Sequence, residues 1–126
     1  MKYILIIFFL GLEVTTLLIA IGFAVNITVF IQILISLLFI LLGNVMGRFK
    51  YNYFVGIKTP WTLANEEVWR RTHRMAGPIW VIAGILNILL TITGVDFYGI
   101  AFIIIMVAIV IVPIVYSYII YKKIVN

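Results

Sequence analysis

The chain has 126 residues, of which 66% are hydrophobic and only 10% are charged. A soluble domain carries about 25% charged residues, and one of this length could not hide so much apolar surface from water. The composition therefore excludes an ordinary soluble domain and predicts an integral membrane protein. The chain has no cysteine, which excludes disulfides, thiol catalysis and cysteine-based zinc sites.

Four apolar runs follow one another along the chain, at about residues 3–25, 28–47, 78–95 and 97–121. Each has roughly the 20 residues that cross a bilayer core. We therefore predict an all-α fold class, a polytopic membrane protein with four transmembrane helices in a single membrane domain. The break at Asn26 is short, so a single long or re-entrant helix is the alternative for the first two runs.

Three residues inside the predicted spans need a structural account. Glu13 lies in the middle of the first run, where an ionised carboxylate costs several kcal/mol; its presence and the length of the run argue against a cleaved signal peptide. Asn87 lies at a similar depth, so we predict an intramembrane pair in which protonated Glu13 donates to Asn87. Proton-linked transport is the alternative role for Glu13. Pro113 in the fourth run has no N–H, which leaves the carbonyl of Ile109 without its helical donor.

The basic residues indicate an orientation. Lys2, Lys122, Lys123 and the six basic residues of 43–77 all fall on one side of a four-helix arrangement, while Asp96 falls on the other. The positive-inside rule then predicts a cell-membrane protein with both termini and the central loop in the cytoplasm. The same rule explains the net charge of +5 without a nucleic-acid partner.

The stretch 43–77 concentrates the polar chemistry, because it holds six of the nine basic residues, two of the four acids and the one histidine. Residues 64–76 alternate apolar and polar side chains with a helical period, which predicts an amphipathic helix along the cytoplasmic surface of the membrane. We expect Thr62 or Asn65 to cap this helix. Gly77 should end it, and Pro78 should begin the third span.

Charged residues on the polar face of this helix have the spacing of helical ion pairs. Glu66–Arg70 and Glu67–Arg71 are both i,i+4 pairs. His73 lies on the same face, and we expect it to bond a carboxylate such as Glu66 rather than to act as a catalyst. One histidine without cysteines also disfavours a metal site.

Short blocks in this region resemble the signature of the SdpI family. They are GN at 43–44, KYN at 50–52, GIKTPWT at 56–62, NEEVW at 65–69, THR at 72–74 and Gly77. The resemblance covers about a third of the chain, and the spacing agrees across separate blocks. Lys58 stands where arginine is common in the family, and the founding member is longer, with additional helices.

The resemblance implies a bacterial or archaeal membrane protein of the toxin-immunity type. It implies membrane lipids, a secreted membrane-active peptide toxin and a cytoplasmic repressor as partners, and hence a role in signal transduction. It implies no cofactor and no catalytic residue. A homo-oligomer is compatible with the sequence.

The candidate residues for binding a ligand or partner lie in the signature region. They are Asn44, Lys50, Asn52, Lys58, Trp61, Glu66, Trp69, Arg70, His73 and Arg74. One interpretation is a basic membrane anchor that touches anionic lipid; the other is a shaped pocket for a phosphate, a carboxylate or a peptide terminus. The asparagines favour a pocket, because an electrostatic anchor does not need them.

Two functions follow from these observations. The first is an SdpI-like immunity or signalling protein that recognises a peptide toxin or a cytoplasmic regulator through the basic loop. The alternative is a small transporter or a membrane protein that binds a lipid headgroup or phosphate, including an enzyme acting on a phosphorylated lipid. The sequence shows no nucleophile–base pair and no phosphate-binding glycine loop, which disfavours an enzyme.

Overall fold

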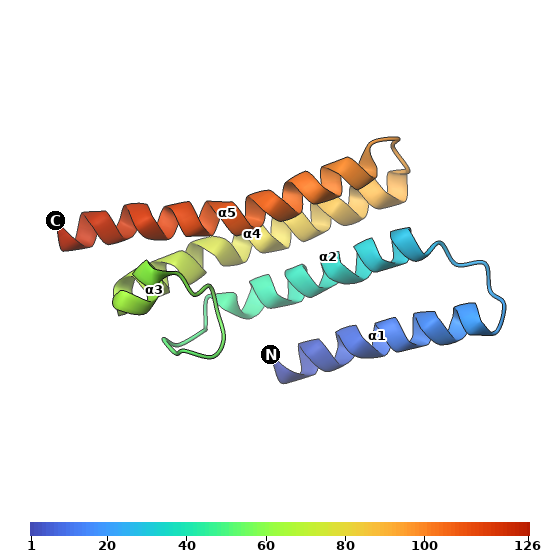
Figure 1. Cartoon of the computed structure of the whole chain (residues 1–126), viewed down its shortest axis with the longest axis horizontal. Helices are drawn as coiled ribbons and strands as arrows, with labels where there is room; N and C mark the ends of the chain where they lie inside the picture. The colour runs from blue at the N-terminus through green and yellow to red at the C-terminus, as the bar shows by residue number, and fades with distance from the viewer.

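The computed structural model describes all 126 residues and contains five helices (Figure 1). They are α1 (Lys2–Ala20), α2 (Ile27–Met46), α3 (Pro60–Ala64), α4 (Glu66–Thr93) and α5 (Tyr98–Val125). All except α3 are long and apolar enough to cross a membrane. The prediction of an all-α, multi-pass membrane protein is therefore confirmed.

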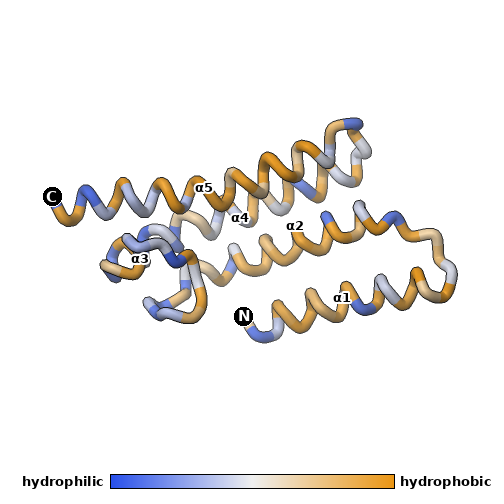
Figure 2. Tube along the Cα trace, in the orientation of Figure 1, coloured by the Kyte–Doolittle hydropathy of each residue, from blue (hydrophilic) through white to orange (hydrophobic).

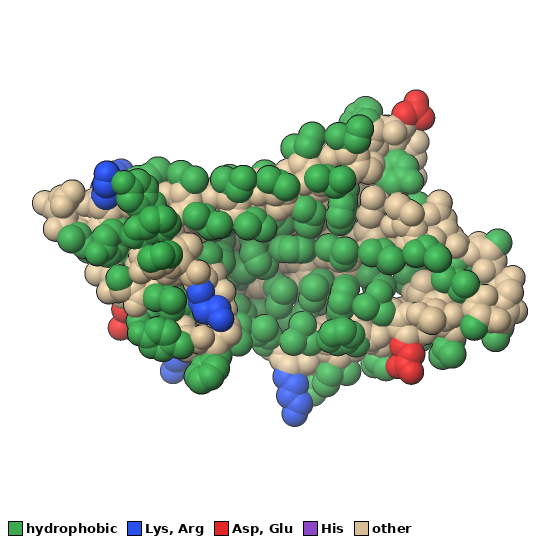
Figure 3. Space-filling view, in the orientation of Figure 1, with side chains coloured by type: hydrophobic (Ala, Val, Ile, Leu, Met, Phe, Trp, Pro, Cys, Tyr) green, Lys and Arg blue, Asp and Glu red, His purple; other side chains and the backbone are tan.

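The four long helices form two antiparallel hairpins, α1–α2 and α4–α5 (Figure 1). The C-terminus and α3 lie at one end of the molecule, the two short turns lie at the other, and the N-terminus lies nearer the middle, at the end of α1 away from its turn. Most of the Lys and Arg side chains visible in Figure 3 lie toward the end with α3. Figure 2 shows the long helices as mostly hydrophobic and the segment around α3 as more hydrophilic. We call the end that holds α3 (Pro60–Ala64) and the C-terminus the loop end.

Asparagine side chains begin two of the long helices. The Oδ1 of Asn26 accepts a hydrogen bond from the N–H of Val29 at the start of α2. The Oδ1 of Asn65 accepts from the N–H groups of Glu67 and Val68 at the start of α4. Each cap accepts hydrogen bonds from backbone N–H groups that have no partner within the first helical turn. Asn65 is one of the two caps that the sequence predicts.

The structure contradicts the predicted boundary at Gly77 and Pro78. Residues 66–76 are not a separate interfacial helix but the first turns of α4, which continues through both residues to Thr93. At 28 residues, α4 is about 42 Å long, which exceeds a hydrocarbon core of about 30 Å. Its charged first turns, 66–74, therefore extend beyond the apolar part. Gly77 serves close helix packing, because a Cβ there would lie 2.8 Å from the carbonyl oxygen of Gly43.

Helix α4 packs between α2 and α5, whereas α1 packs on α2. Small residues set the approach of α2 to α4. A Cβ on Gly43 would lie 2.6 Å from the carbonyl oxygen of Gly77, and one on Gly84 would lie 2.6 Å from that of Ser36. Membrane helices use such small residues to bring their backbones together.

Helix α5 continues through Pro113 because a side chain from α4 replaces the missing backbone donor. The indole Nε1 of Trp80 donates a hydrogen bond of 3.1 Å to the carbonyl of Ile109. This is the carbonyl that Pro113 leaves free. The Trp80 ring also packs edge-on against Phe39 of α2, with ring centroids 4.7 Å apart. Trp80 therefore links three helices.

The predicted pairing of Glu13 with Asn87 is wrong. Glu13 is exposed on α1, and it is not among the α1 residues that line a cavity with α2. Asn87 is 1% exposed, and neither atom of its amide has a hydrogen-bond partner. The pairing fails because α1 packs on α2 and not on α4. A similar depth in the membrane is therefore not enough to bring Glu13 close to Asn87.

Candidate functional site

The signature loop, residues 47–65, folds against the first turns of α4, and His73 holds it there. The ring of His73 stacks on that of Trp69, with centroids 4.1 Å apart. Its Nε2 accepts a hydrogen bond of 2.8 Å from the N–H of Ile57. Because Nε2 accepts, Nδ1 carries the proton and donates to the carbonyl of Trp69 at 2.8 Å. His73 is therefore neutral, and both of its nitrogens are bonded to backbone.

This arrangement corrects the expectation that His73 lies on a polar face and bonds Glu66. Its side chain is 1% exposed. Burial lowers the pKa of the His73 imidazole below its ordinary value, because the charged form loses its hydration. The helical period placed His73 among charged residues, but the loop covers that part of the helix.

Gly56 allows the loop to approach the rings of Trp69 and His73. Its φ is +136°, a backbone conformation that favours glycine. A Cβ at this position would lie 2.5 Å from Nε2 of His73 and 2.5 Å from the Trp69 ring. Gly56 is therefore required both by its conformation and by the space around it.

Trp69 is a buried part of the same scaffold. Its Nε1 donates a hydrogen bond of 2.9 Å to the carbonyl of Phe49. The ring of Tyr51 packs edge-on against it, with centroids 5.6 Å apart, and the hydroxyl of Tyr51 donates to the carbonyl of Leu63. Trp69 is 1% exposed, so these contacts account for its signature position.

Asn52 shapes the loop from within. Its Oδ1 accepts from the N–H groups of Phe54 and Val55, at 2.8 Å each. Its Nδ2 donates to the carbonyls of Lys50 and Val55. Every one of these bonds stays inside the turn, as is common for asparagine in loops. Asn52 therefore supports the fold of the loop, and the predicted role in a pocket does not fit its contacts.

The segment around α3 joins the loop to α5. Thr59 and Thr62 form a capping box at the start of α3, and the hydroxyls of Thr59 and Ser117 lie 3.0 Å apart. The ring of Trp61 packs against Tyr118, with centroids 5.0 Å apart. Trp61 thus faces α5, and it does not join the other predicted pocket residues.

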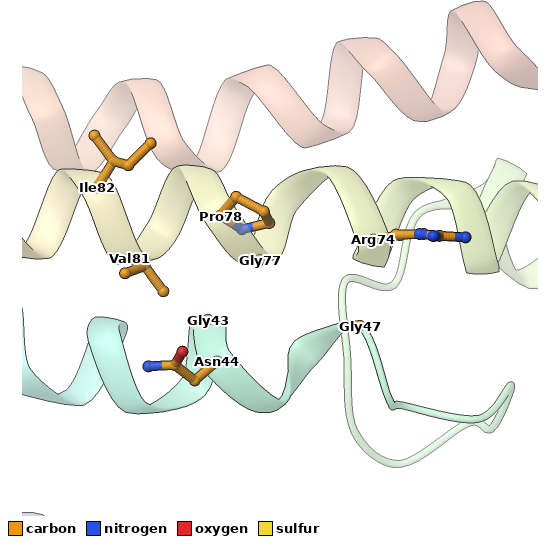
Figure 4. Close-up of a pocket in the computed structure, with 8 residues that line it drawn as sticks. All are labelled: Gly43, Asn44, Gly47, Arg74, Gly77, Pro78, Val81 and Ile82. Carbon is orange, nitrogen blue, oxygen red and sulfur yellow. The ribbon is translucent and has the colours of Figure 1, made fainter.

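An open cleft lies between the end of α2 and the middle of α4 (Figure 4). Its volume is about 440 Å³. Its lining residues are Gly43, Asn44, Gly47, Arg74, Gly77, Pro78, Val81 and Ile82. We call it the Asn44–Arg74 cleft. The Nδ2 of Asn44 donates to the carbonyl of Ile40 within its own helix, which leaves its Oδ1 free to accept.

A second cavity adjoins the cleft and shares Gly47 with it. Its volume is about 500 Å³. Its lining residues are Gly47, Arg48, Phe49, Lys50, Tyr51, Glu66, Trp69 and Arg70. We call it the loop cavity. Of the predicted site residues, the structure therefore brings Asn44 and Arg74 to the cleft, and Lys50, Glu66, Trp69 and Arg70 to the loop cavity.

Of the two ion pairs predicted at the loop end, Glu67–Arg71 is confirmed and Glu66–Arg70 is not. Glu67 pairs with both Arg70, in a two-bond contact of 2.8 Å each, and Arg71, at 2.6 Å. Arg71 and then Arg70 lower the pKa of the Glu67 carboxyl. The predicted Glu66–Arg70 pair does not form, because Glu67 reaches both arginines at i,i+3 and i,i+4.

Three basic residues around the two cavities have no carboxylate partner: Arg48, Lys50 and Arg74. All three are exposed. Lys58 lies outside both cavities, and its Nζ donates to the carbonyl of Phe54 at 3.2 Å. Three of the basic residues without a carboxylate partner therefore line one or other of the two cavities.

The sequence that forms this site matches a known protein family. Residues 48–117 match the SdpI/YfhL protein family. The chain is a member of the SdpI/YfhL family. Over 84 residues it is 38% identical to the protein named Immunity protein SdpI of Bacillus subtilis (strain 168); the match covers 66% of this chain and 41% of that relative. The chain thus spans about two fifths of the length of that relative. No solved structure matches the chain.

Within this member of the SdpI/YfhL family, the signature residues divide into two groups. Asn52, Trp61, Trp69 and His73 build and hold the loop, whereas Asn44, Lys50, Glu66, Arg70 and Arg74 face the cavities. Sequence reasoning missed Gly47 and Arg48 as lining residues. The i,i+4 spacing of Gly43 and Gly47 was the available signal, because small residues one turn apart mark a close helix approach.

Proposed function

We propose that this SdpI/YfhL-family protein is an immunity protein that protects its cell from a membrane-active peptide. The membership of the family and the name of the Bacillus relative support this proposal. The observation that carries it to particular residues is the concentration of unpaired Arg48, Lys50 and Arg74 around two adjoining cavities. These residues are suited to bind an acidic group of the peptide or of a cytoplasmic regulator.

The contacts of His73 argue against hydrolysis of the peptide. A general base needs a nitrogen within hydrogen-bond reach of a reacting group. Both nitrogens of the one histidine are bonded to the backbone, at Ile57 and Trp69, and the ring is buried. Protection should therefore proceed by recognition, with the peptide left intact.

Protection can be measured in a peptide-sensitive strain that expresses the full chain. The probe is a purified membrane-active peptide that kills the strain when the protein is absent. We expect the expressing cells to survive while the peptide stays at its starting concentration in the medium. Loss of protection in Lys50→Ala and Arg74→Ala, at normal membrane levels, would support the assignment of the site. Disappearance of the peptide from the medium, or survival no better than that of cells without the protein, would refute the proposal.

The proposal also includes an orientation, with the loop end in the cytoplasm. The chain has no cysteine, so single cysteines can be introduced without background labelling. We expect Asp96→Cys, between α4 and α5, to react with an impermeant reagent in intact cells. Lys58→Cys should react only after the cells are opened. The reverse pattern would place the cavities outside the cell and exclude a cytoplasmic regulator as partner.

A further inference from the structure

The Asn44–Arg74 cleft changes in character along its length. Arg74 and Gly47 lie at one end of it, and Val81 and Ile82 lie at the other (Figure 4). The first end adjoins the charged turns of α4, and the second belongs to the apolar part that crosses the membrane. A ligand that fills this cleft must therefore have a charged part and an apolar part.

The charged part of such a ligand must be negative. Arg70 and Arg71 share one carboxylate, that of Glu67, whereas Arg74, one turn farther along α4, has no carboxylate partner. The adjoining loop cavity adds Arg48 and Lys50. An arginine guanidinium binds phosphate or carboxylate through two parallel hydrogen bonds. Asn44 has a free acceptor in the same cleft, but its amide lies toward Val81 and points away from Arg74 (Figure 4), so Arg74 is the residue placed to bind the negative group.

The cleft is accessible from the side of the molecule that lipid surrounds. Ile82 in its wall is 65% exposed. Two of its lining residues are glycines packed backbone to backbone, Gly43 and Gly77, which contribute no side chain of their own to the cleft. A volume of about 440 Å³ lies within the range of small-ligand sites, roughly 300–1,000 Å³.

We propose that the Asn44–Arg74 cleft binds the phosphate of an anionic membrane lipid. Arg74 contacts the phosphate, and the first part of the acyl chains lies along Val81 and Ile82. This inference goes beyond the proposed immunity function and does not depend on it, because the lipid would occupy the cleft with or without a peptide.

The chain offers variants that separate a shaped site from a general basic surface. Arg74→Lys retains the charge but removes the planar fork of the guanidinium. Gly47→Leu retains every charge and fills the cleft: a Cβ at Gly47 meets only the Cα of Arg74, at 4.0 Å, and its φ of −64° suits any residue. Arg71→Ala is the matched control, because it removes one positive charge from the same helix outside both cavities.

The test measures how much phosphatidylglycerol the purified full chain retains from mixed micelles with phosphatidylcholine, by native mass spectrometry. We expect the wild type to prefer phosphatidylglycerol. Arg74→Ala and Gly47→Leu should weaken its binding about tenfold or more, as the loss of a charge-assisted hydrogen bond would. Arg74→Lys should fall between these and the wild type, and Arg71→Ala should change binding less than about twofold.

Several outcomes would overturn the proposal. Equal losses in Arg71→Ala and Arg74→Ala would show a general basic anchor, and equal retention of the two lipids would show no site. Displacement of phosphatidylglycerol by millimolar inorganic phosphate would show a site for free phosphate instead. Thermal unfolding of each variant in detergent verifies its fold, and Arg74→Lys supplies the comparison if Arg74→Ala unfolds. A variant that loses lipid binding but still protects cells from the peptide would count against the lipid site and not against the immunity function. A variant that binds lipid normally but no longer protects cells would count the other way.

Discussion

Gly43 of α2 and Gly77 of α4 pack backbone against backbone. A Cβ on Gly43 would lie 2.6 Å from the carbonyl oxygen of Gly77, and a Cβ on Gly77 would lie 2.8 Å from that of Gly43. This contact sets the distance between the two helices at the floor of the Asn44–Arg74 cleft. It also explains why a glycine lies in the interior of a long helix, where its intrinsic propensity is poor.

Adding one methyl group at this contact should therefore destabilise the protein. We expect Gly43→Ala and Gly77→Ala each to lower the free energy of unfolding by about 1–3 kcal/mol, the usual cost of overpacking. Gly99→Ala is the control, because a Cβ there has no neighbour within 4 Å, and alanine favours a helix. Thermal unfolding in detergent measures all three. Unchanged stability in both interface variants would show that α2 and α4 do not approach so closely.

The bond from Trp80 to the carbonyl of Ile109 should matter only because Pro113 is present. Trp80→Phe keeps an aromatic ring near Phe39 but removes the donor, and we expect it to cost about 1–3 kcal/mol, as for an unpaired carbonyl. In a Pro113→Ala background, residue 113 regains its N–H, so the same change should cost less. A double-mutant cycle measures the difference. Equal costs in the two backgrounds would contradict this explanation of Trp80.

Asn87 is buried between helices without a hydrogen-bond partner. We expect Asn87→Leu, which keeps a similar volume, to raise the free energy of unfolding by about 1 kcal/mol, because it removes an unpaired polar group. Ser36→Ala is the comparison; the Ser36 hydroxyl bonds the carbonyl of Gln32 in its own helix, and we expect little change. A loss of stability in Asn87→Leu would mean that the amide has a bonding partner in the membrane.

Acid should weaken the attachment of the signature loop through His73. Burial lowers the pKa of His73 in the folded state, whereas the unfolded chain takes up a proton near the ordinary pKa of about 6.5. The unfolded state therefore binds more protons below that pH, and stability falls as the pH decreases from 7 toward 5. The His73→Gln variant should be less stable than the wild type at pH 7.5, but its stability should change less between pH 7 and pH 5. An equal slope in the wild type and the variant would exclude His73 as the cause.

The amino-acid sequence by itself determined the class of this protein and its spans. Continuous apolar runs of bilayer length indicate membrane helices, because a helix satisfies its backbone hydrogen bonds within one segment in lipid. The signature blocks also indicated the family and the region that holds both cavities. These features depend on composition and local spacing, which need no knowledge of the packing.

The tertiary structure decided which signature residues face a cavity and which support the fold. His73 falls on the polar face of a helical projection, yet the loop covers both His73 and Trp69. The side-chain amide of Asn52 forms all of its hydrogen bonds inside one turn. The partner of the Ile109 carbonyl and the isolation of Glu13 from Asn87 depend in the same way on which helices pack together. Hydrophobic periodicity records that a face is buried, but it does not record what buries it, and so the cleft emerges only from the contact of α2 with α4.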